Sequence, residues 1–328
     1  MPEEYRVPHR MSVEPDRDLS FRWLYVGEKR FTEPFFEETI SRCMGFPQNS
    51  SGSLPTIKAQ ELIAAAEAVD AVEPTAFVFH VSRCGSTLVS QLLSLDERCI
   101  VLSEVPVLDD ILRLPFKKER PSPGPSPEDL FRAALRILGK RRGVQEQHLV
   151  VKFDSWHTMF FHRIRQCYPR VPAVLLYRSP REVLRSHQKQ IGMQAIPNLI
   201  EPEVFGFDTQ QISDLHPIPY LVRVLERCFQ ESLRILETDA LAWPLSYHDG
   251  ALTMVQQLAL HSDIRLCDQA ITTMKARLAR HSKRPDTLFG EEPALDSGGT
   301  QMPALEELYR RLDLFAGSLP VRMHRQPQ

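Results

Sequence analysis

The stretch Ala76-Phe-Val-Phe-His-Val-Ser-Arg-Cys-Gly-Ser-Thr-Leu-Val-Ser-Gln-Leu-Leu93 decides the fold expected for this chain. Its first six residues are apolar or aromatic apart from one histidine, which is typical of a strand buried on both faces of a parallel sheet. Residues 88–93 carry leucine and valine at three- and four-residue spacing, the pattern of an amphipathic helix. A short polar turn joins the two parts, so the stretch predicts a strand–turn–helix unit.

Similar units follow along the chain. Short apolar or β-branched runs at 99–102, 148–153 and 171–177 predict further strands, each followed by a segment with helical features. Strands that alternate with helices form a mostly parallel sheet covered by helices on both faces. We therefore expect a three-layer α/β domain over residues 71–328, with residues 1–70 as an N-terminal accessory segment packed on the core.

Composition and charge limit the partners of the chain. Its 328 residues have a formal net charge of −2, so no overall basic field would attract nucleic acid or an anionic membrane. It has no run of about 18 apolar residues, which a membrane-spanning helix needs, and its N-terminus lacks the apolar centre of a signal peptide. Six scattered cysteines without a Cys-x-x-Cys pair are typical of reduced thiols. We therefore expect a cytoplasmic protein without a nucleic-acid partner or a membrane span.

The turn after the first strand of the domain has the features of an anion site. Free backbone N–H groups and the positive end of a helix meet there. Gly85 allows a phosphate to approach closely, Ser86 and Thr87 can donate hydroxyl hydrogen bonds, and Arg83 supplies a forked cation. An ordinary strand–helix turn is the alternative interpretation. The turn departs from a Walker A loop, because no lysine follows the glycine.

Cys84 lies inside this turn and could suggest a cysteine phosphatase. Such an enzyme places an arginine six residues after its nucleophile, and here that position is Ser90. We therefore interpret Cys84 as a small residue packed in the phosphate loop rather than as a nucleophile.

The segment Phe79-His-Val-Ser-Arg-Cys-Gly-Ser-Thr-Leu-Val89 resembles the 5′-phosphosulfate-binding loop of the sulfotransferase superfamily, in particular its bacterial and tyrosylprotein branch. The resemblance implies a P-loop-NTPase-like sulfotransferase fold, the cofactor 3′-phosphoadenosine 5′-phosphosulfate (PAPS) and the product adenosine 3′,5′-bisphosphate (PAP). It also implies that the loop holds the 5′ side of the cofactor, through Arg83, Cys84, Gly85, Ser86 and Thr87. Arg83 would neutralise charge on the oxygen that leaves with the product.

A second element is similar to the family's 3′-phosphate site. Arg178 follows the strand at 171–177, and Ser186 stands eight residues later on the next helix. The arginine supplies a planar cationic fork and the serine a hydroxyl for the same phosphate. In the family a late segment also reaches the cofactor, which suggests Ser282 and Lys283 here, with a solvated basic cluster as the alternative interpretation.

Sulfuryl transfer needs an in-line nucleophile, a base for its proton and cations on the departing oxygens. Glu104, near the end of the second strand, is the leading general base, and a favourable charge at a helix start is its alternative role. Lys152, at the end of the third strand, would stabilise charge on the transferring group. Asp154 stands where small-molecule members of the family carry a histidine base, so it is the alternative or auxiliary base.

No metal site is expected. The resemblance implies a metal-independent reaction, and His157 and His162 are five residues apart, off a common helical face. No carboxylate or cysteine completes a ligand set with them at the usual spacing.

The sequence thus predicts a sulfotransferase that moves a sulfuryl group from PAPS to a hydroxyl or amine of a small-molecule or peptide acceptor. Two alternatives stay open. One is an ATP- and magnesium-dependent kinase with a degenerate P-loop, and the other is a non-catalytic nucleotide-binding protein that retains the fold.

Overall fold

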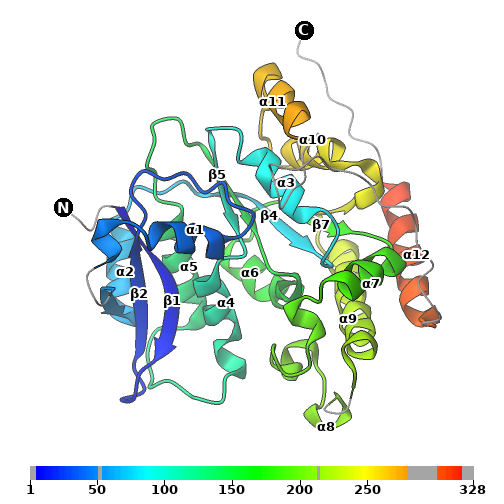
Figure 1. Ribbon diagram of the computed structural model, residues 1–328, viewed down its shortest axis with the longest axis horizontal. Helices are drawn as coiled ribbons and strands as arrows, with labels where there is room; N and C mark the ends of the chain where they lie inside the picture. Colours follow the sequence, from blue (N-terminus) through cyan, green and yellow to red (C-terminus); the bar gives the residue numbers. More distant parts are fainter. Residues whose placement is uncertain (1–4, 51–53, 213–214, 279–300, 320–328) are drawn as a thin grey trace.

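A five-stranded sheet forms the centre of the computed structural model, which describes residues 5–50, 54–212, 215–278 and 301–319 (Figure 1). All of its neighbouring strand pairs are parallel. Across the sheet, the strands run in the order β5 (Cys99–Ser103), β6 (His148–Lys152), β4 (Pro74–His80), β7 (Ala173–Tyr177) and β8 (Ala242–Ser246).

Burial explains why these runs form central strands. Every residue of β5 and of β7 is buried, and so are the last five residues of β4. A strand covered on both faces has no solvent side, so its apolar run is continuous rather than alternating. The predicted α/β class with a mostly parallel sheet is confirmed, and the runs at 99–102, 148–153 and 171–177 are confirmed as strands.

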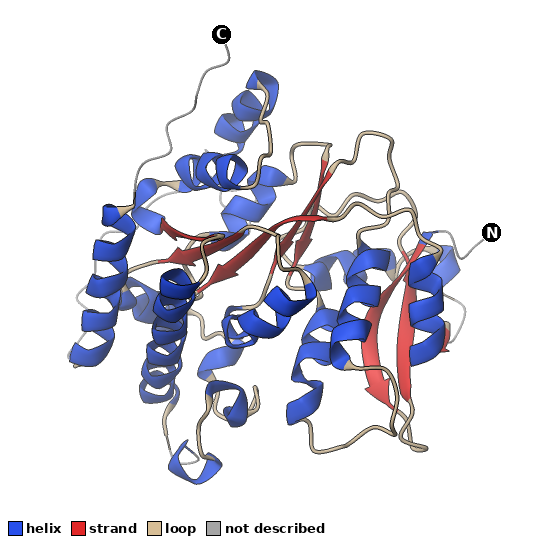
Figure 2. Cartoon of the chain, turned by 180° about the vertical axis from the view of Figure 1, so that it is seen from behind, coloured by secondary structure: helices blue, strands red, loops and turns tan. Residues whose placement is uncertain are grey.

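Helices cover both faces of this sheet (Figure 2). In Figure 1, α3 and α10 lie on one side of the strands, and α5, α6 and α9 lie on the other. The helices are α1 (Phe36–Cys43), α2 (Ala59–Glu67), α3 (Ser86–Leu93), α4 (Pro106–Arg113), α5 (Pro127–Leu138), α6 (Phe161–Cys167), α7 (Pro180–Lys189), α8 (Thr209–Ile212), α9 (Pro217–Thr238), α10 (Ala251–His261), α11 (Asp268–Leu278) and α12 (Pro303–Ser318).

The residues before β4 form a small antiparallel sheet of β1 (Arg6–Val13), β2 (Leu19–Tyr25) and β3 (Thr56–Lys58), together with α1 and α2. β1 packs against α4 and α5, and α2 packs against α5. The N-terminal segment therefore shares its apolar contacts with helices of the parallel-sheet domain. Of the helices in the part of the chain that the structure describes, none is both long and apolar enough to cross a membrane.

The topology places the predicted site residues at one edge of the sheet. Parallel strands end at the same edge, and β4 stands between β6 and β7, so the turn after β4 leaves between their ends. Two of the helices that start with a proline follow predicted site residues, α4 directly after Glu104-Val105 and α7 directly after Arg178-Ser179. Since proline presets the helical φ and needs no N–H partner there, Glu104 and Arg178 are held close to the strand tips.

A buried histidine makes the N-terminal sheet sensitive to acid. His9 lies at the register shift between Pro8 and Arg10 of β1, is 4% exposed, and neither ring nitrogen has a hydrogen-bond partner among the described residues. Burial, with Arg22 and Arg10 nearby, lowers the pKa of His9 from 6.5 to about 4. The folded state thus binds this proton less readily than the unfolded state, so stability is complete above pH 6.5 and falls toward pH 4.

We predict that His9→Leu removes part of this acid sensitivity. Between pH 6.5 and pH 4, the free energy of unfolding of the parent should fall by about 1–2 kcal/mol more than that of the variant. Urea unfolding at several pH values measures the difference. His162 is exposed, so His162→Gln is the matched control and should follow the parent. Parallel pH profiles for the parent and His9→Leu would contradict the assignment.

Candidate functional site

The turn after β4 has positive φ angles, which residues other than glycine rarely adopt. Ser82, Arg83 and Gly85 have φ values of 76°, 51° and 82°, and α3 begins directly afterwards at Ser86. A left-handed conformation costs a non-glycine residue about 1–2 kcal/mol, so two such residues in sequence need outside support. The first N–H groups of α3 have no partner within the helix, and they open toward this turn.

Ser82 receives that support from three side chains. Its backbone N–H donates to His80 Nδ1 at 3.1 Å, and its hydroxyl oxygen accepts from Gln194 Nε2 at 2.5 Å and lies 3.1 Å from His187 Nε2. The Gly192 N–H donates to His187 Nδ1 at 3.1 Å, so the proton of this ring is on Nε2, which donates to Ser82. Groups from β4, α7 and the segment after α7 therefore fix the start of the turn.

Gly85 needs both its left-handed backbone and its missing side chain. A Cβ atom there would lie 3.0 Å from Cδ2 of Tyr247, closer than carbon atoms normally pack. Tyr247 follows β8, and its ring also lies 3.9 Å from Cζ of Arg178. Sequence analysis missed this tyrosine, although its position directly after the last strand places it at the same edge of the sheet.

Arg178 joins the two predicted phosphate anchors. Its Nη1 donates to the backbone oxygen of Arg83 at 3.2 Å, and its Nη2 donates to Glu182 at 2.9 Å. Its Nε is buried and has no hydrogen-bond partner among the described residues, and the same holds for Nε of Arg185 on α7. Ser186 lies half-buried on that helix. The structure therefore brings the turn after β4 and the arginine after β7 together, with buried donors that fit an anion.

Arg83 reaches across to the end of α7, where its Nη2 donates to the backbone oxygen of Gln190 at 2.7 Å. Burial lowers the pKa of Arg83, and the charge of Glu104 acts in the opposite direction. The predicted base therefore lies within electrostatic range of the phosphate turn.

Cys84, Ser86 and Thr87 occupy the rest of the turn and the start of α3. Cys84 is fully buried, and burial raises the pKa of its thiol to about 11, so the sulfur keeps its proton at neutral pH. This agrees with a packing role for the side chain. Ser86 is buried and Thr87 is half-buried at the first turn of α3. The predicted Ser282 and Lys283 lie outside the described residues.

Glu104 and Lys152 form an ion pair at the tips of β5 and β6. Lys152 has no exposed surface, and the N–H of Glu104 donates to the backbone oxygen of Lys152 at 2.8 Å. Burial acts to raise the pKa of Glu104, but the Lys152 ammonium and His80 lower it from 4.5 to about 2. This arrangement keeps the carboxylate ionised at neutral pH.

His80, the last residue of β4, connects this pair to the phosphate turn. Its Nε2 donates to the backbone oxygen of Phe153 at 2.9 Å and lies 3.6 Å from Oε1 of Glu104. Its Nδ1 accepts the Ser82 N–H, so the ring is a neutral imidazole with its proton on Nε2. Burial lowers the pKa of His80, in agreement with this state. The sequence analysis gave this residue no role.

The pKa of Asp154 is shifted in the opposite direction to that of Glu104. Burial raises its pKa well above the usual value, and the negative charges of Glu104 and Asp109 raise it further. When two neighbouring carboxyl groups have pKa values moved in opposite directions, one can keep a proton while the other accepts one. Ionisation is therefore favoured at Glu104 and disfavoured at Asp154.

A cluster that the spacing argument missed surrounds Asp154. Asp109, from α4, brings a carboxylate to His157 and Asp154, with their oxygen and nitrogen atoms within 4.8 Å of one another. Asp109 accepts from Trp156 Nε1 at 2.6 Å, and its distances to His157 Nε2 and Arg113 Nη1 are 2.9 and 2.8 Å. Since Asp109 already has these partners, we interpret the cluster as a network of ion pairs and hydrogen bonds.

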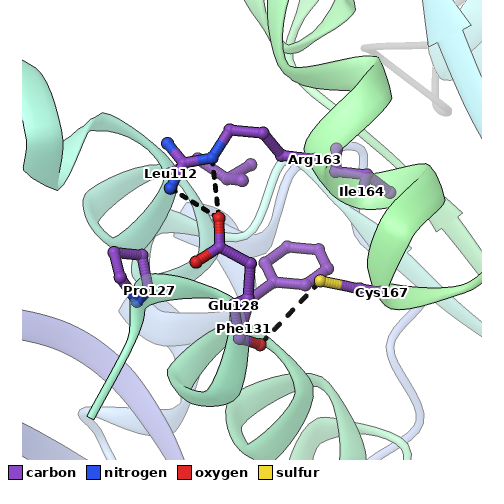
Figure 3. Close-up of a pocket in the computed structure, with 7 residues that line it drawn as sticks. All are labelled: Leu112, Pro127, Glu128, Phe131, Arg163, Ile164 and Cys167. Atoms are coloured by element: carbon purple, nitrogen blue, oxygen red, sulfur yellow. Dashed lines mark hydrogen bonds and ion pairs between the residues drawn. The ribbon is translucent and has the colours of Figure 1, made fainter.

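A small crevice elsewhere contains none of the predicted site residues (Figure 3). It lies between α5, α6 and the end of α4, and Arg163 crosses it to form an ion pair with Glu128 at 2.7 Å. The other lining residues are Leu112, Pro127, Phe131, Ile164 and Cys167. The crevice is therefore separate from the site at the strand tips.

Comparison with known proteins gives likenesses in structure only. No family model matches the chain, and no curated protein matches it significantly. It is similar to sulfotransferase STF9 from Mycobacterium avium, at 14% identity and a TM-score of 0.48, over 78% of this chain and 81% of that one. It is also similar to a sulfotransferase from Alicyclobacillus acidocaldarius, at 14% identity and a TM-score of 0.41, over 75% of this chain and 94% of that one.

A third similar structure is mouse sulfotransferase SULT7A1 complexed with PAP, at 10% identity and a TM-score of 0.37, over 81% of this chain and 87% of that one. All three of these solved structures are sulfotransferases.

We predict that the close contact with Tyr247 makes Gly85→Ala more harmful than the same change at a comparable glycine. Gly206 has a φ of 71°, but a Cβ there would find its nearest neighbour at 3.8 Å. Gly206→Ala should therefore cost about 1 kcal/mol of stability through backbone strain alone, and Gly85→Ala about 2–3 kcal/mol. Urea unfolding measures both values, and equal losses would show that the Tyr247 contact is not restrictive.

Proposed function

We propose that this chain binds PAPS and transfers its sulfuryl group to a hydroxyl or amine of an acceptor. The observation that carries the proposal is the hydrogen bond from Arg178 to the backbone oxygen of Arg83, two residues 95 positions apart in the chain. PAPS carries a phosphosulfate at its 5′ position and a phosphate at its 3′ position. A protein that binds both the phosphosulfate and the phosphate needs two anion sites in one pocket.

The residues present fit such a nucleotide. On the 5′ side, the N-terminus of α3 with Gly85, Ser86 and Thr87 offers backbone and hydroxyl donors. On the 3′ side, Arg178 and Ser186 form the anchor, and the buried unpaired Nε of Arg178 supplies a donor that a phosphate oxygen satisfies. Ser282 and Lys283 remain predicted contacts of the cofactor.

The chemistry follows from the charges at the strand tips. The acceptor O–H or N–H gives its proton to the Glu104 carboxylate while its oxygen or nitrogen attacks sulfur. The bond between sulfur and the bridging oxygen breaks, and PAP leaves with that electron pair. Arg83 and Lys152 stabilise the negative charge that develops on the departing and transferring oxygens. Burial and the neighbouring carboxylates raise the pKa of Asp154, so it is the less readily ionised of the two carboxyl groups.

Nucleotide binding tests the two-anchor pocket. We predict that PAP binds and that adenosine 5′-phosphate, which lacks the 3′-phosphate, binds about 10–100-fold more weakly, the usual size of a hydrogen bond to a charged group. Arg178→Ala should weaken PAP binding by a similar factor and leave adenosine 5′-phosphate almost unaffected. Calorimetric titration measures both ligands.

The kinase alternative gives a different result in the same titration. Magnesium–ATP would then bind more tightly than PAP, and Arg178→Ala would weaken both adenine nucleotides alike. Arg181 lies three residues further on, is exposed and pairs with Glu306, so Arg181→Ala is the matched control for a general loss of positive charge.

Measurement of the sulfuryl-transfer rate tests the proposed role of Glu104 as the base. With a labelled sulfate donor and a cell extract as the source of acceptors, Glu104→Gln should lower the transfer rate about 10²–10⁴-fold, the usual contribution of a general base. Its affinity for PAP should stay within about threefold of the parent. Asp154→Asn should be less damaging, because burial and the neighbouring carboxylates raise the pKa of Asp154 and disfavour its ionised form. A larger loss for Asp154→Asn than for Glu104→Gln would reverse the two roles, and unlabelled extract with the parent protein would favour a non-catalytic nucleotide-binding protein.

A further inference from the structure

The segment of residues 190–201, which follows α7, presents an exposed apolar face. Eight large hydrophobic side chains of the described residues are exposed, and four of them are in this segment. They are Ile191, Met193, Ile196 and Leu199, with exposed fractions of 44%, 50%, 39% and 43%. Such a concentration of exposed apolar groups within a few residues is a feature of binding surfaces rather than of ordinary loops.

The rest of the segment is packed into the protein. Ala195 and Ile200 are 0% and 1% exposed, and Gln194 is 7% exposed. A poorly packed loop would leave both kinds of side chain partly accessible. Here buried residues anchor the backbone, and the four exposed apolar side chains, which we call the apolar face, are left toward solvent.

One end of this segment is bonded to the phosphate turn. Gln190 accepts from Arg83 through its backbone oxygen, and Gln194 donates to the hydroxyl of Ser82 at 2.5 Å. Gly192 approaches His187 so closely that a Cβ atom would lie 2.8 Å from its ring carbon Cε1. The apolar face thus begins directly beside the residues proposed to hold the 5′-phosphosulfate.

The other end is bonded to the carboxylate cluster. Arg113 donates to the backbone oxygen of Leu199 at 3.2 Å and to the carboxylate of Glu201 at 2.7 Å. The same arginine pairs with Asp109, which lies next to Asp154. In Figure 1 the green chain between α7 and α8 lies between α4 and α9, beyond the strand tips. The segment therefore extends from the phosphate turn to the cluster around the predicted auxiliary base.

An aromatic ring lies close to the ion pair of Lys152 and Glu104. Phe35, from the N-terminal part of the chain, is half-buried, and its ring centre lies 5.0 Å from Nζ of Lys152, the partner of Glu104. An acceptor that approaches Glu104 thus meets an aromatic side chain as well as the ion pair.

We propose that residues 190–201 bind the apolar part of the acceptor, so that the acceptors of this chain carry the reacting hydroxyl or amine on a hydrophobic group. This inference rests on the proposed function, because the face adjoins the site through the phosphate turn and the carboxylate cluster. The occupant is the acceptor because one end of the segment is bonded to Arg83 of the phosphate turn, and the other end to Arg113, whose partner Asp109 lies next to Asp154. Burial of each methylene of such an acceptor strengthens binding by about fourfold when it is complete.

A series of 4-alkylphenols, from 4-methylphenol to 4-hexylphenol, tests this proposal with PAPS as donor. We expect kcat/KM to rise by about two- to fourfold per methylene. The double variant Ile191→Ser/Met193→Ser should flatten that rise and leave the affinity for PAP unchanged. Val144 and Leu314 are exposed by 95% and 68% in other parts of the chain, so Val144→Ser/Leu314→Ser is the matched control and should keep the parent's slope.

Direct binding separates this inference from the proposed function. Calorimetry with 4-hexylphenol, with and without PAP, should show about tenfold weaker binding to Ile191→Ser/Met193→Ser than to the control variant. If PAP does not bind, the sulfotransferase proposal fails, and the phenol titration still reports on the apolar face. Equal phenol binding by both variants would overturn the inference.

Discussion

The hydrogen bond between the Arg178 guanidinium and the backbone oxygen of Arg83 is the constraint on which the candidate site depends. It joins the loop after β4 to the loop after β7, and it fixes the distance between two clusters of anion donors. The Tyr247 ring covers the same junction, against Gly85 on one side and Arg178 on the other. A small ligand with two separated anionic groups can be held there only because the parallel sheet ends both strands at one edge.

The surroundings of the buried ionisable groups favour ionisation of some and disfavour ionisation of others. Lys152 is completely buried, and a buried charge is strongly unfavourable unless it is paired. Its pairing with Glu104 keeps that carboxylate ionised, and the same negative charge raises the pKa of Asp154. The neutral His80 then connects the ion pair to the strained turn, because its Nε2 donates to the backbone oxygen of Phe153 beside Lys152 and its Nδ1 accepts from the Ser82 N–H.

Local patterns in the sequence were sufficient to predict four strands of the parallel sheet and the turn of 82–87. A continuous apolar run predicts a two-sided buried strand, and the turn of 82–87 follows from the change in polarity after it. The contacts of His80, Tyr247 and Asp109 could not be predicted in this way, because each depends on elements distant in the sequence. Asp109 and His157 are 48 positions apart in the sequence, and a motif based on residue spacing does not predict that their side chains are in contact. The cytoplasmic location and the division at residue 70 remain predictions.

The most direct test of the account is a crystal structure of the protein with PAP bound. The account predicts that the 3′-phosphate lies within about 2.7–3.2 Å of donor atoms of Arg178, and that the 5′-phosphate lies at a similar distance from the backbone N–H groups at the start of α3. It also predicts that Arg178 exchanges Glu182 for the phosphate. A structure in which PAP occupies another surface, or in which Arg178 keeps its bond to Glu182 while the 3′-phosphate points to solvent, would contradict the central claim.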